Sequence, residues 1–181
     1  MTTATRRVLC LCGSLRRVSS NRAALEAARQ LAPPSLELLP YDGLAALPLF
    51  NPDDERDPLP TAVLVLREVV GRADALLVAC PEYAHGVPGA FKNLLDWLVG
   101  SLEFPGKPVL LLNTSARGST HAQEALAEIL RTMSACLLAP APVPVALPGA
   151  GCTADQVLAS TDRCAELQAA LDVLAGIPPE R

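Results

Sequence analysis

Short apolar runs that alternate with helix-like segments constrain the fold of this chain more than any other feature. Two of these runs, Val8–Cys12 and Ala75–Cys80, contain no charged residue. A strand that is apolar on both faces is typical of a parallel sheet covered by helices on both sides. Three further runs are predicted as strands: Leu36–Pro40, Pro108–Asn113 and the proline-interrupted stretch Leu137–Val145.

Apolar residues between and after these runs recur with the spacing of amphipathic helices. The predicted helices are Asn21–Leu31, Ala62–Arg72, Gly89–Gly100, Ser119–Ala135 and Thr153–Ala175. Alternation of strand and helix predicts an α/β sheet with right-handed crossovers. The pattern fits one domain over residues 1–181, a doubly wound five-stranded parallel sheet of order 2-1-3-4-5 with helices on both faces. The acidic stretch Asn51–Pro60 is expected to form an exposed loop.

Charge and composition exclude several classes of partner. The net charge is −4 and aromatic residues make up 3% of the chain, whereas nucleic-acid binding favours basic patches or stacking aromatics. No apolar run reaches the roughly 18 residues that a membrane-spanning helix requires. The apolar run after Met1–Arg7 is too short for a secretion signal. We therefore expect a cytoplasmic protein without nucleic-acid or membrane partners.

The six cysteines do not have the spacing of a metal site. Cys10 and Cys12 are two residues apart in a predicted strand, and the chain has only two histidines, His85 and His121. Structural zinc sites use C-x-x-C-type pairs with nearby histidine or cysteine partners. We expect reduced, structural thiols and no metal.

A polar loop follows the first predicted strand, at the edge of the sheet where ligands of doubly wound folds bind. The segment Gly13–Asn21 brings hydroxyl groups and Arg16 to a helix N-terminus. Backbone N–H groups, the helix dipole and a guanidinium favour an anion such as phosphate at this point. The alternative is an ordinary N-cap. The glycine patterns of a P-loop and of a dinucleotide-binding turn are both absent.

Two more loops are predicted at the same edge. Pro81–Gly89, after the third strand, is rich in Pro and Gly and suits a planar ring, or is only a structured turn. Asn113–His121, after the fourth strand, offers hydrogen-bond donors, or only caps the next helix. A phosphate site beside two loops of this kind suits a mononucleotide such as FMN, with its phosphate, ribityl chain and flat ring.

Two blocks of sequence resemble the NADPH-dependent FMN reductase family. The first is Gly13-Ser14-Leu15-Arg16 with Ser19 and Asn21, and the second is Pro81-Glu82-Tyr83 followed by Val87-Pro88-Gly89, Lys92-Asn93 and Asp96-Trp97. The resemblance covers nearly the whole chain and implies a flavodoxin-like fold. It further implies non-covalently bound FMN, NADPH or NADH as hydride donor, and a homodimer or dimer of dimers. Electrons would then pass to a flavin, a quinone or a similar acceptor.

The resemblance also assigns FMN-binding residues by position. The expected contacts are Ser14, Arg16, Ser19, Ser20 and Asn21 at the phosphate, Pro81, Glu82, Tyr83, Ala84, His85 and Gly86 at the ring, and Ser115, Ala116, Arg117 and Gly118 from the fourth strand. Ala84 departs from the asparagine of many family members, and the fourth-strand loop lacks the usual Gly-Gly pair. No residue is nominated as a catalytic acid or base. Two alternatives remain: a flavodoxin-like electron carrier, and a flavin-binding or interaction protein without turnover.

Three residues carry more detailed expectations. Trp97 lies outside the apolar stripe of its helix, which predicts a partner surface in a homodimer. The Glu82 carboxylate is expected to turn away from the ring or be paired, and so to brace its loop. Gly86 is expected to tolerate no larger residue, because a Cβ would crowd the ring or force φ out of a region that only glycine adopts easily.

Overall fold

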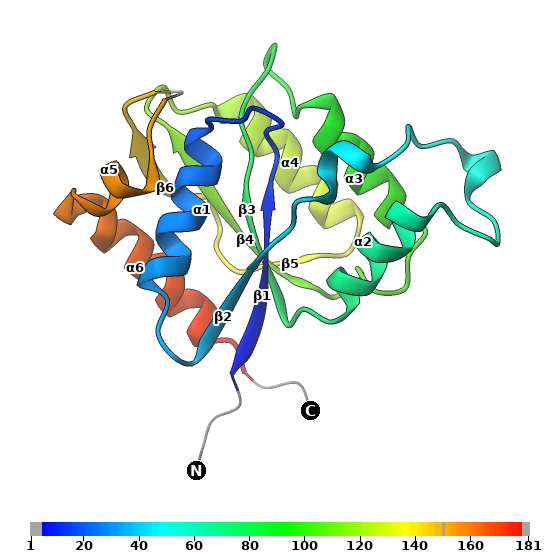
Figure 1. Cartoon of the computed structure of the whole chain (residues 1–181), viewed down its shortest axis with the longest axis horizontal. Coiled ribbons are helices and arrows are strands. Elements are labelled where there is room, and N and C mark those ends of the chain that lie inside the picture. The colour runs from blue at the N-terminus through cyan, green and yellow to red at the C-terminus, as the bar shows by residue number, and fades with distance from the viewer. Residues whose placement is uncertain (1–4, 150, 179–181) are drawn as a thin grey trace.

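The computed structural model describes residues 5–149 and 151–178, which contain one parallel sheet (Figure 1). Its strands are β1 (Arg6–Cys12), β2 (Leu36–Pro40), β3 (Ala75–Ala79), β4 (Pro108–Ser115), β5 (Cys136–Leu137) and β6 (Val143–Leu147). The order is β2-β1-β3-β4, and both β5 and β6 pair with β4. Every pairing is parallel, which confirms the predicted order 2-1-3-4-5.

The fifth strand position differs from the prediction, because two short strands fill it instead of one. β5 pairs with the start of β4 at Pro108 and Val109, and β6 pairs with its end from Leu112 onward. Pro140 and Pro142 lie between the two strands. Proline has no N–H to donate to a ladder, so the chain leaves the sheet there and returns further along β4.

The predicted final helix is also divided, into α5 (Ala154–Leu158) and α6 (Thr161–Ala175). Between them Ser160 has an extended backbone, with φ −106° and ψ 115°. Ser160 stands at the N-cap position of α6, a position that favours serine. α6 is therefore a separate helix and not a continuation of α5.

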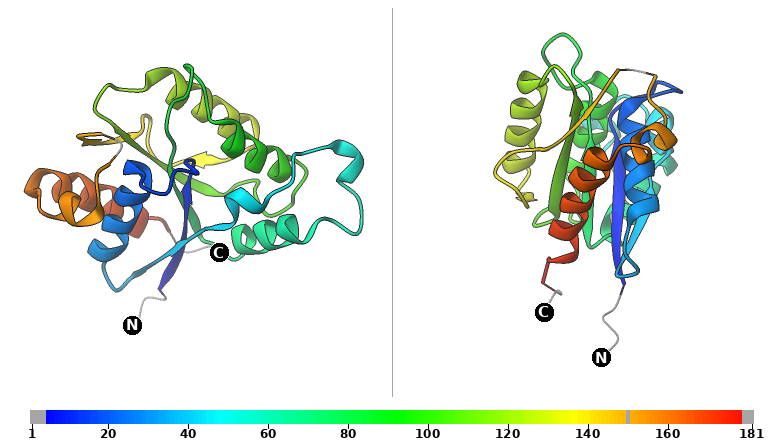
Figure 2. Two further views of the ribbon diagram at one scale, coloured as in Figure 1. Left: turned by 45° about the horizontal axis from the view of Figure 1, so that its top comes forward. Right: turned by 90° about the vertical axis from the view of Figure 1, so that its left-hand side faces the viewer.

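Helices cover both faces of the sheet (Figures 1 and 2). α1 (Ser20–Leu31), α5 and α6 pack on one face, while α2 (Thr61–Gly71), α3 (Gly89–Val99) and α4 (Thr120–Thr132) pack on the other. Side chains of β1 alternate between the two cores, Cys10 on the α1 side and Leu11 on the α3 side. This double burial is the physical reason that the buried part of β1, Val8–Cys12, contains no charged residue. None of the described helices is long and apolar enough to cross a membrane.

The connection from β2 to α2 packs against the flank of α3 that carries Asn93 and Trp97. It contains two short 3-10 helices, η1 (Gly43–Ala46) and η2 (Pro52–Asp54). Residues 51–54 are exposed, as predicted for the acidic stretch. Glu55 anchors this stretch through an ion pair with Arg67 of α2, with Oε1 2.6 Å from Nη2.

This connection overturns the expectation for Trp97, whose side chain is fully buried within the chain itself. Its indole N–H donates to the Pro48 carbonyl over 2.8 Å. Its ring meets Phe50 edge to face, with centroids 5.0 Å apart. The prediction of a partner surface at Trp97 is wrong, because a segment far away in sequence covers the side of α3 that does not face the sheet.

Candidate active site

A cavity of about 660 Å³ lies beyond the carboxyl ends of β1, β3, β4 and β6. Its volume is within the range of roughly 300–1,000 Å³ that is usual for small-molecule and cofactor sites. The sequence-predicted residues that line it are Ser14, Arg16, Ser19, Ser20, Asn21, Pro81, Glu82, Tyr83, His85, Ser115, Ala116 and Arg117. All three predicted loops therefore meet in one cavity. Ala84, Gly86 and Gly118, also predicted, are not among the lining residues.

Buried hydroxyl groups gather at the N-terminus of α1. Ser14 and Ser19 are only 4% and 6% exposed. Ser19 is the N-cap residue, but its side chain makes no capping hydrogen bond. The first turn of α1 also contains no acidic residue. These features favour a site for an anion over the alternative of an ordinary side-chain cap.

Arg16 and Arg117 add positive charge to the cavity from two different loops, and both residues are exposed. The Arg16 backbone N–H donates to Ser14 Oγ over 3.2 Å, which folds the first loop back on itself. Guanidinium groups match the geometry of phosphate oxygens. The cavity thus has cationic groups as well as the partial positive charge of the α1 N-terminus.

A buried hydrogen bond fixes the first loop relative to the fourth strand. Thr114 Oγ1 donates to Asn21 Oδ1 over 3.0 Å, and both residues are buried. Ser20 Oγ donates to the carbonyl of Gly149, a residue that follows β6. Sequence reasoning missed this last segment of the cavity wall, because the fifth strand was expected to end before it. The further lining residues that were not predicted are Cys80, Thr114, Ser119, Leu147, Pro148 and Gly149.

Gly13 allows the first loop to pass close to the end of β3. A Cβ at this position would lie 2.7 Å from Cys80 Sγ and 3.1 Å from Cys80 Cα, so a larger residue would force the two segments apart. Burial raises the pKa of the Cys80 thiol to about 12. Cys80 is therefore a neutral wall residue and not a nucleophile at neutral pH.

Glu82 joins the third-strand loop to α4, which confirms that its carboxylate is paired. Its Oε2 accepts a hydrogen bond from the Ala122 backbone N–H over 2.9 Å, in the first turn of α4. Its Oε1 lies 3.4 Å from His85 Nδ1. A carboxylate at a helix N-terminus satisfies a free N–H group and complements the helix dipole.

Gly86 does not adopt a positive φ, so that part of its expectation is wrong; the left-handed residues of this loop are its neighbours. Ala84 and His85 have φ values of 50° and 58°. Tyr83 and Gly86 exchange backbone hydrogen bonds of 3.1 and 3.0 Å around them. Two central residues with positive φ are the mark of a type I′ turn, which favours Asn and Gly. Ala84 thus departs from the family asparagine at a position where Asn relieves backbone strain.

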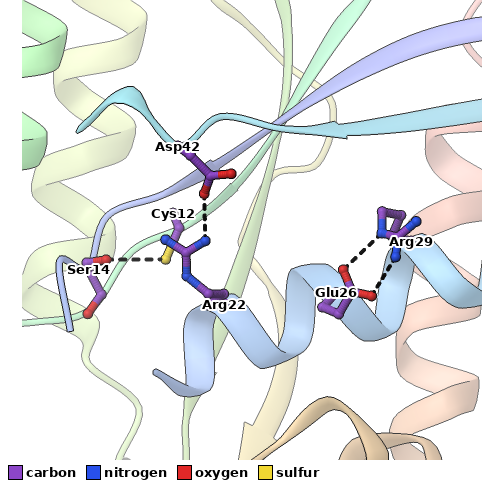
Figure 3. A network of polar contacts seen from close by, with 6 residues as sticks. All are labelled: Cys12, Ser14, Arg22, Glu26, Arg29 and Asp42. Atoms are coloured by element: carbon purple, nitrogen blue, oxygen red, sulfur yellow. Dashed lines mark hydrogen bonds and ion pairs between the residues drawn. The ribbon is translucent and has the colours of Figure 1, made fainter. Parts of the chain in front are cut away.

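A second polar network lies behind the first loop (Figure 3). Arg22 of α1 pairs with Asp42 after β2, with Nη1 2.7 Å from Oδ1. Cys12 Sγ donates to the Ser14 carbonyl over 3.7 Å, and burial raises the pKa of this thiol. The contact from Cys12 thus ties the first loop to the end of β1. No group of three or more His, Cys, Asp or Glu residues that would suit a metal ion occurs in the part of the chain that the structure describes.

Comparison with known proteins agrees with this site. The sequence model of the family described as NADPH-dependent FMN reductase matches residues 6–146. An NAD(P)H-dependent FMN reductase of Pseudomonas aeruginosa is 41% identical over 128 residues, which are 68% of this chain and 69% of that protein. A quinone reductase of Escherichia coli is 34% identical over 136 residues, 72% of each chain.

The fold comparison leads to the same family. The structure of FerB, an NAD(P)H:(acceptor) oxidoreductase of Paracoccus denitrificans, has a TM-score of 0.74 and 27% identity, and the match covers 94% of this chain and 97% of FerB. These matches favour an enzyme over an electron carrier or a non-catalytic binding protein. The chain belongs to the NADPH-dependent FMN reductase family and is an FMN-dependent NAD(P)H oxidoreductase.

Proposed function

We propose that the cavity binds FMN and that the protein, as a single domain, uses it to reduce a quinone with NADPH or NADH. The observation that carries the proposal is the convergence of three loops around the α1 N-terminus, where Ser14 and Ser19 present buried hydroxyl groups. Relatives named quinone reductases support the choice of acceptor. Bound FMN supplies hydride transfer between the nicotinamide and the second substrate.

The residues present fit each part of this cofactor. The α1 N-terminus, with Arg16 beside it, would hold the phosphate. The loop from Pro81 to His85 would flank the ring, and Glu82 keeps that loop against α4. Ser115 and Arg117 would supply polar contacts from the fourth strand. The chain thus binds and orients the cofactor.

Arg16→Ala tests the position of the phosphate. Loss of a hydrogen bond to a charged group costs about 1.5–3 kcal/mol, and because Arg16 is exposed we expect the lower end, roughly a tenfold rise in the Kd for FMN. Arg16→Lys should recover only part of the affinity, because the planar fork is lost. Arg17→Ala is the matched control, since Arg17 is exposed and does not line the cavity. Equal FMN affinity in Arg16→Ala and Arg17→Ala would remove Arg16 from the site.

Turnover tests the activity itself. The purified protein should show flavin absorbance and oxidise NADPH or NADH continuously in the presence of excess benzoquinone. A flavin-loaded protein that passes electrons to a protein acceptor but shows no such turnover would contradict the proposal. A cytoplasmic homodimer or dimer of dimers also remains a prediction, and sedimentation of the purified protein tests the oligomeric part of it.

A further inference from the structure

The two histidines of the chain meet at the cavity. His85 lies in the third-strand loop and His121 in the first turn of α4. Their rings contact edge to face, with centroids 4.4 Å apart and planes at 85°. His85 lines the cavity, yet 76% of its side chain is exposed. Its imidazole therefore has access to both a bound substrate and solvent.

The His85 ring contacts the Glu82 carboxylate as well as His121. One carboxylate oxygen is fixed by the Ala122 N–H, and the other lies 3.4 Å from His85 Nδ1. Because Nδ1 faces the carboxylate, Nε2 is the nitrogen left for a substrate. Glu82 from the same loop and His121 from α4 are thus the titratable groups that face this imidazole.

Besides Glu82 and His85, the ionisable side chains in the cavity wall are Arg16, Arg117, Tyr83 and Cys80. Guanidinium groups are not proton donors to a substrate in proteins, and a phenol ordinarily holds its proton more firmly than an imidazolium does. Cys80 is buried, and burial raises its thiol pKa to about 12. Imidazole, in contrast, ordinarily gains and loses a proton close to neutrality.

We propose that His85 supplies the proton that completes quinone reduction, with Glu82 and His121 as the residues that position its ring. This inference rests on the proposed quinone reductase function. A quinone that has received a hydride equivalent derived from NAD(P)H is a monoanion with its charge on oxygen. The N–H bond of the His85 imidazolium breaks, a new O–H bond forms, and a neutral hydroquinone leaves. Solvent then returns one proton to the imidazole.

His85→Asn is the decisive variant. Asparagine tolerates the left-handed conformation that residue 85 adopts, so the turn is kept while the proton donor is lost. General acid catalysis typically contributes about 10²- to 10⁴-fold, and we expect about 10²-fold slower reoxidation by benzoquinone because water also reaches this site. Ferricyanide, which accepts single electrons without a proton, is the internal control, and the fall is measured as the ratio of the quinone rate to the ferricyanide rate of the same variant.

Two readouts separate proton donation from a structural role. Binding of pentafluorophenolate, an unreactive anion of the product type, should weaken with rising pH in the native protein and be nearly independent of pH in His85→Asn. His121→Asn should alter the pH profile of quinone reduction more than that of ferricyanide reduction. Equal slowing with quinone and ferricyanide in His85→Asn would indicate general damage and overturn the inference, as would an unchanged quinone rate.

Measurements on the native protein distinguish an error in the role of His85 from an error in the proposed function. If the native protein binds no FMN, or does not reduce quinone with either nucleotide, the proposed function itself is wrong. If the native protein turns over and His85→Asn matches it with both acceptors across the pH range, only the role of His85 is wrong.

Discussion

Truncation of Glu82 offers a direct test of how the ring loop is held. The carboxylate accepts a 2.9 Å hydrogen bond from Ala122 N–H, and its side chain is only 17% exposed. Glu82→Ala leaves that N–H without its partner in a residue that is 1% exposed. A hydrogen bond to a charged group contributes about 1.5–3 kcal/mol, and the helix dipole accounts for part of that energy. We expect the free energy of unfolding to fall by about 2 kcal/mol.

Glu82→Gln is the matched comparison, because its side-chain oxygen still accepts from Ala122. Only the charge at the helix terminus is lost, so we expect a decrease of about 0.5 kcal/mol and most of the flavin content and turnover retained. Urea unfolding measures the stabilities. The expected difference between the two variants, about 1.5 kcal/mol, corresponds to about 3–6 °C in the Tm of a chain of this length. Glu124→Ala, on the exposed side of α4, controls for general effects on the helix. Equal stability of Glu82→Ala and Glu82→Gln would refute the proposed brace.

Three further predictions follow from burial and backbone geometry. Trp97→Ala should lower the free energy of unfolding by about 3–5 kcal/mol, since it empties a fully buried site; a loss below about 1 kcal/mol in urea unfolding would contradict that packing. Ala84→Asn should raise stability by about 0.5–1 kcal/mol, because Asn accepts a positive φ at lower cost than Ala; a lower Tm would count against the turn geometry. Burial raises the thiol pKa of Cys10 and Cys80 from 9.0 to about 12, so the native state retains protons that the unfolded state releases. The stability that these two buried thiols contribute should therefore be fully present below pH 9 and be lost as pH rises from 9 toward 12. A free energy of unfolding that stays constant from pH 8 to pH 10.5 would refute this.

The sequence by itself determined the sheet and the place of the site. Strands that are buried on both faces must be apolar throughout, so runs such as Ala75–Cys80 mark the parallel sheet without any tertiary information. The carboxyl ends of parallel strands share one edge, so the polar loops that follow three of them were bound to converge. This is why residues as distant in sequence as Ser14, Tyr83 and Arg117 line one cavity.

Only the tertiary structure decided which side chains of these loops face the cavity. Ala84 and Gly86 lie in the predicted loop, but the turn between Tyr83 and Gly86 leaves them outside the cavity wall while His85 lines it. Local sequence indicates that a turn is present, but the type of turn depends on the φ angles that its central residues adopt in the folded chain.

Contacts between distant segments account for the remaining differences. Trp97 is buried by Pro48 and Phe50, and the end of β6 reaches the cavity only because the chain leaves the sheet and rejoins it along β4. The meeting of His85 with His121 likewise depends on how the third-strand loop and α4 pack together. Periodicity reports which side of an element faces its sheet. It holds no information about the segment that covers the other side, because that contact is made by chain far away in sequence.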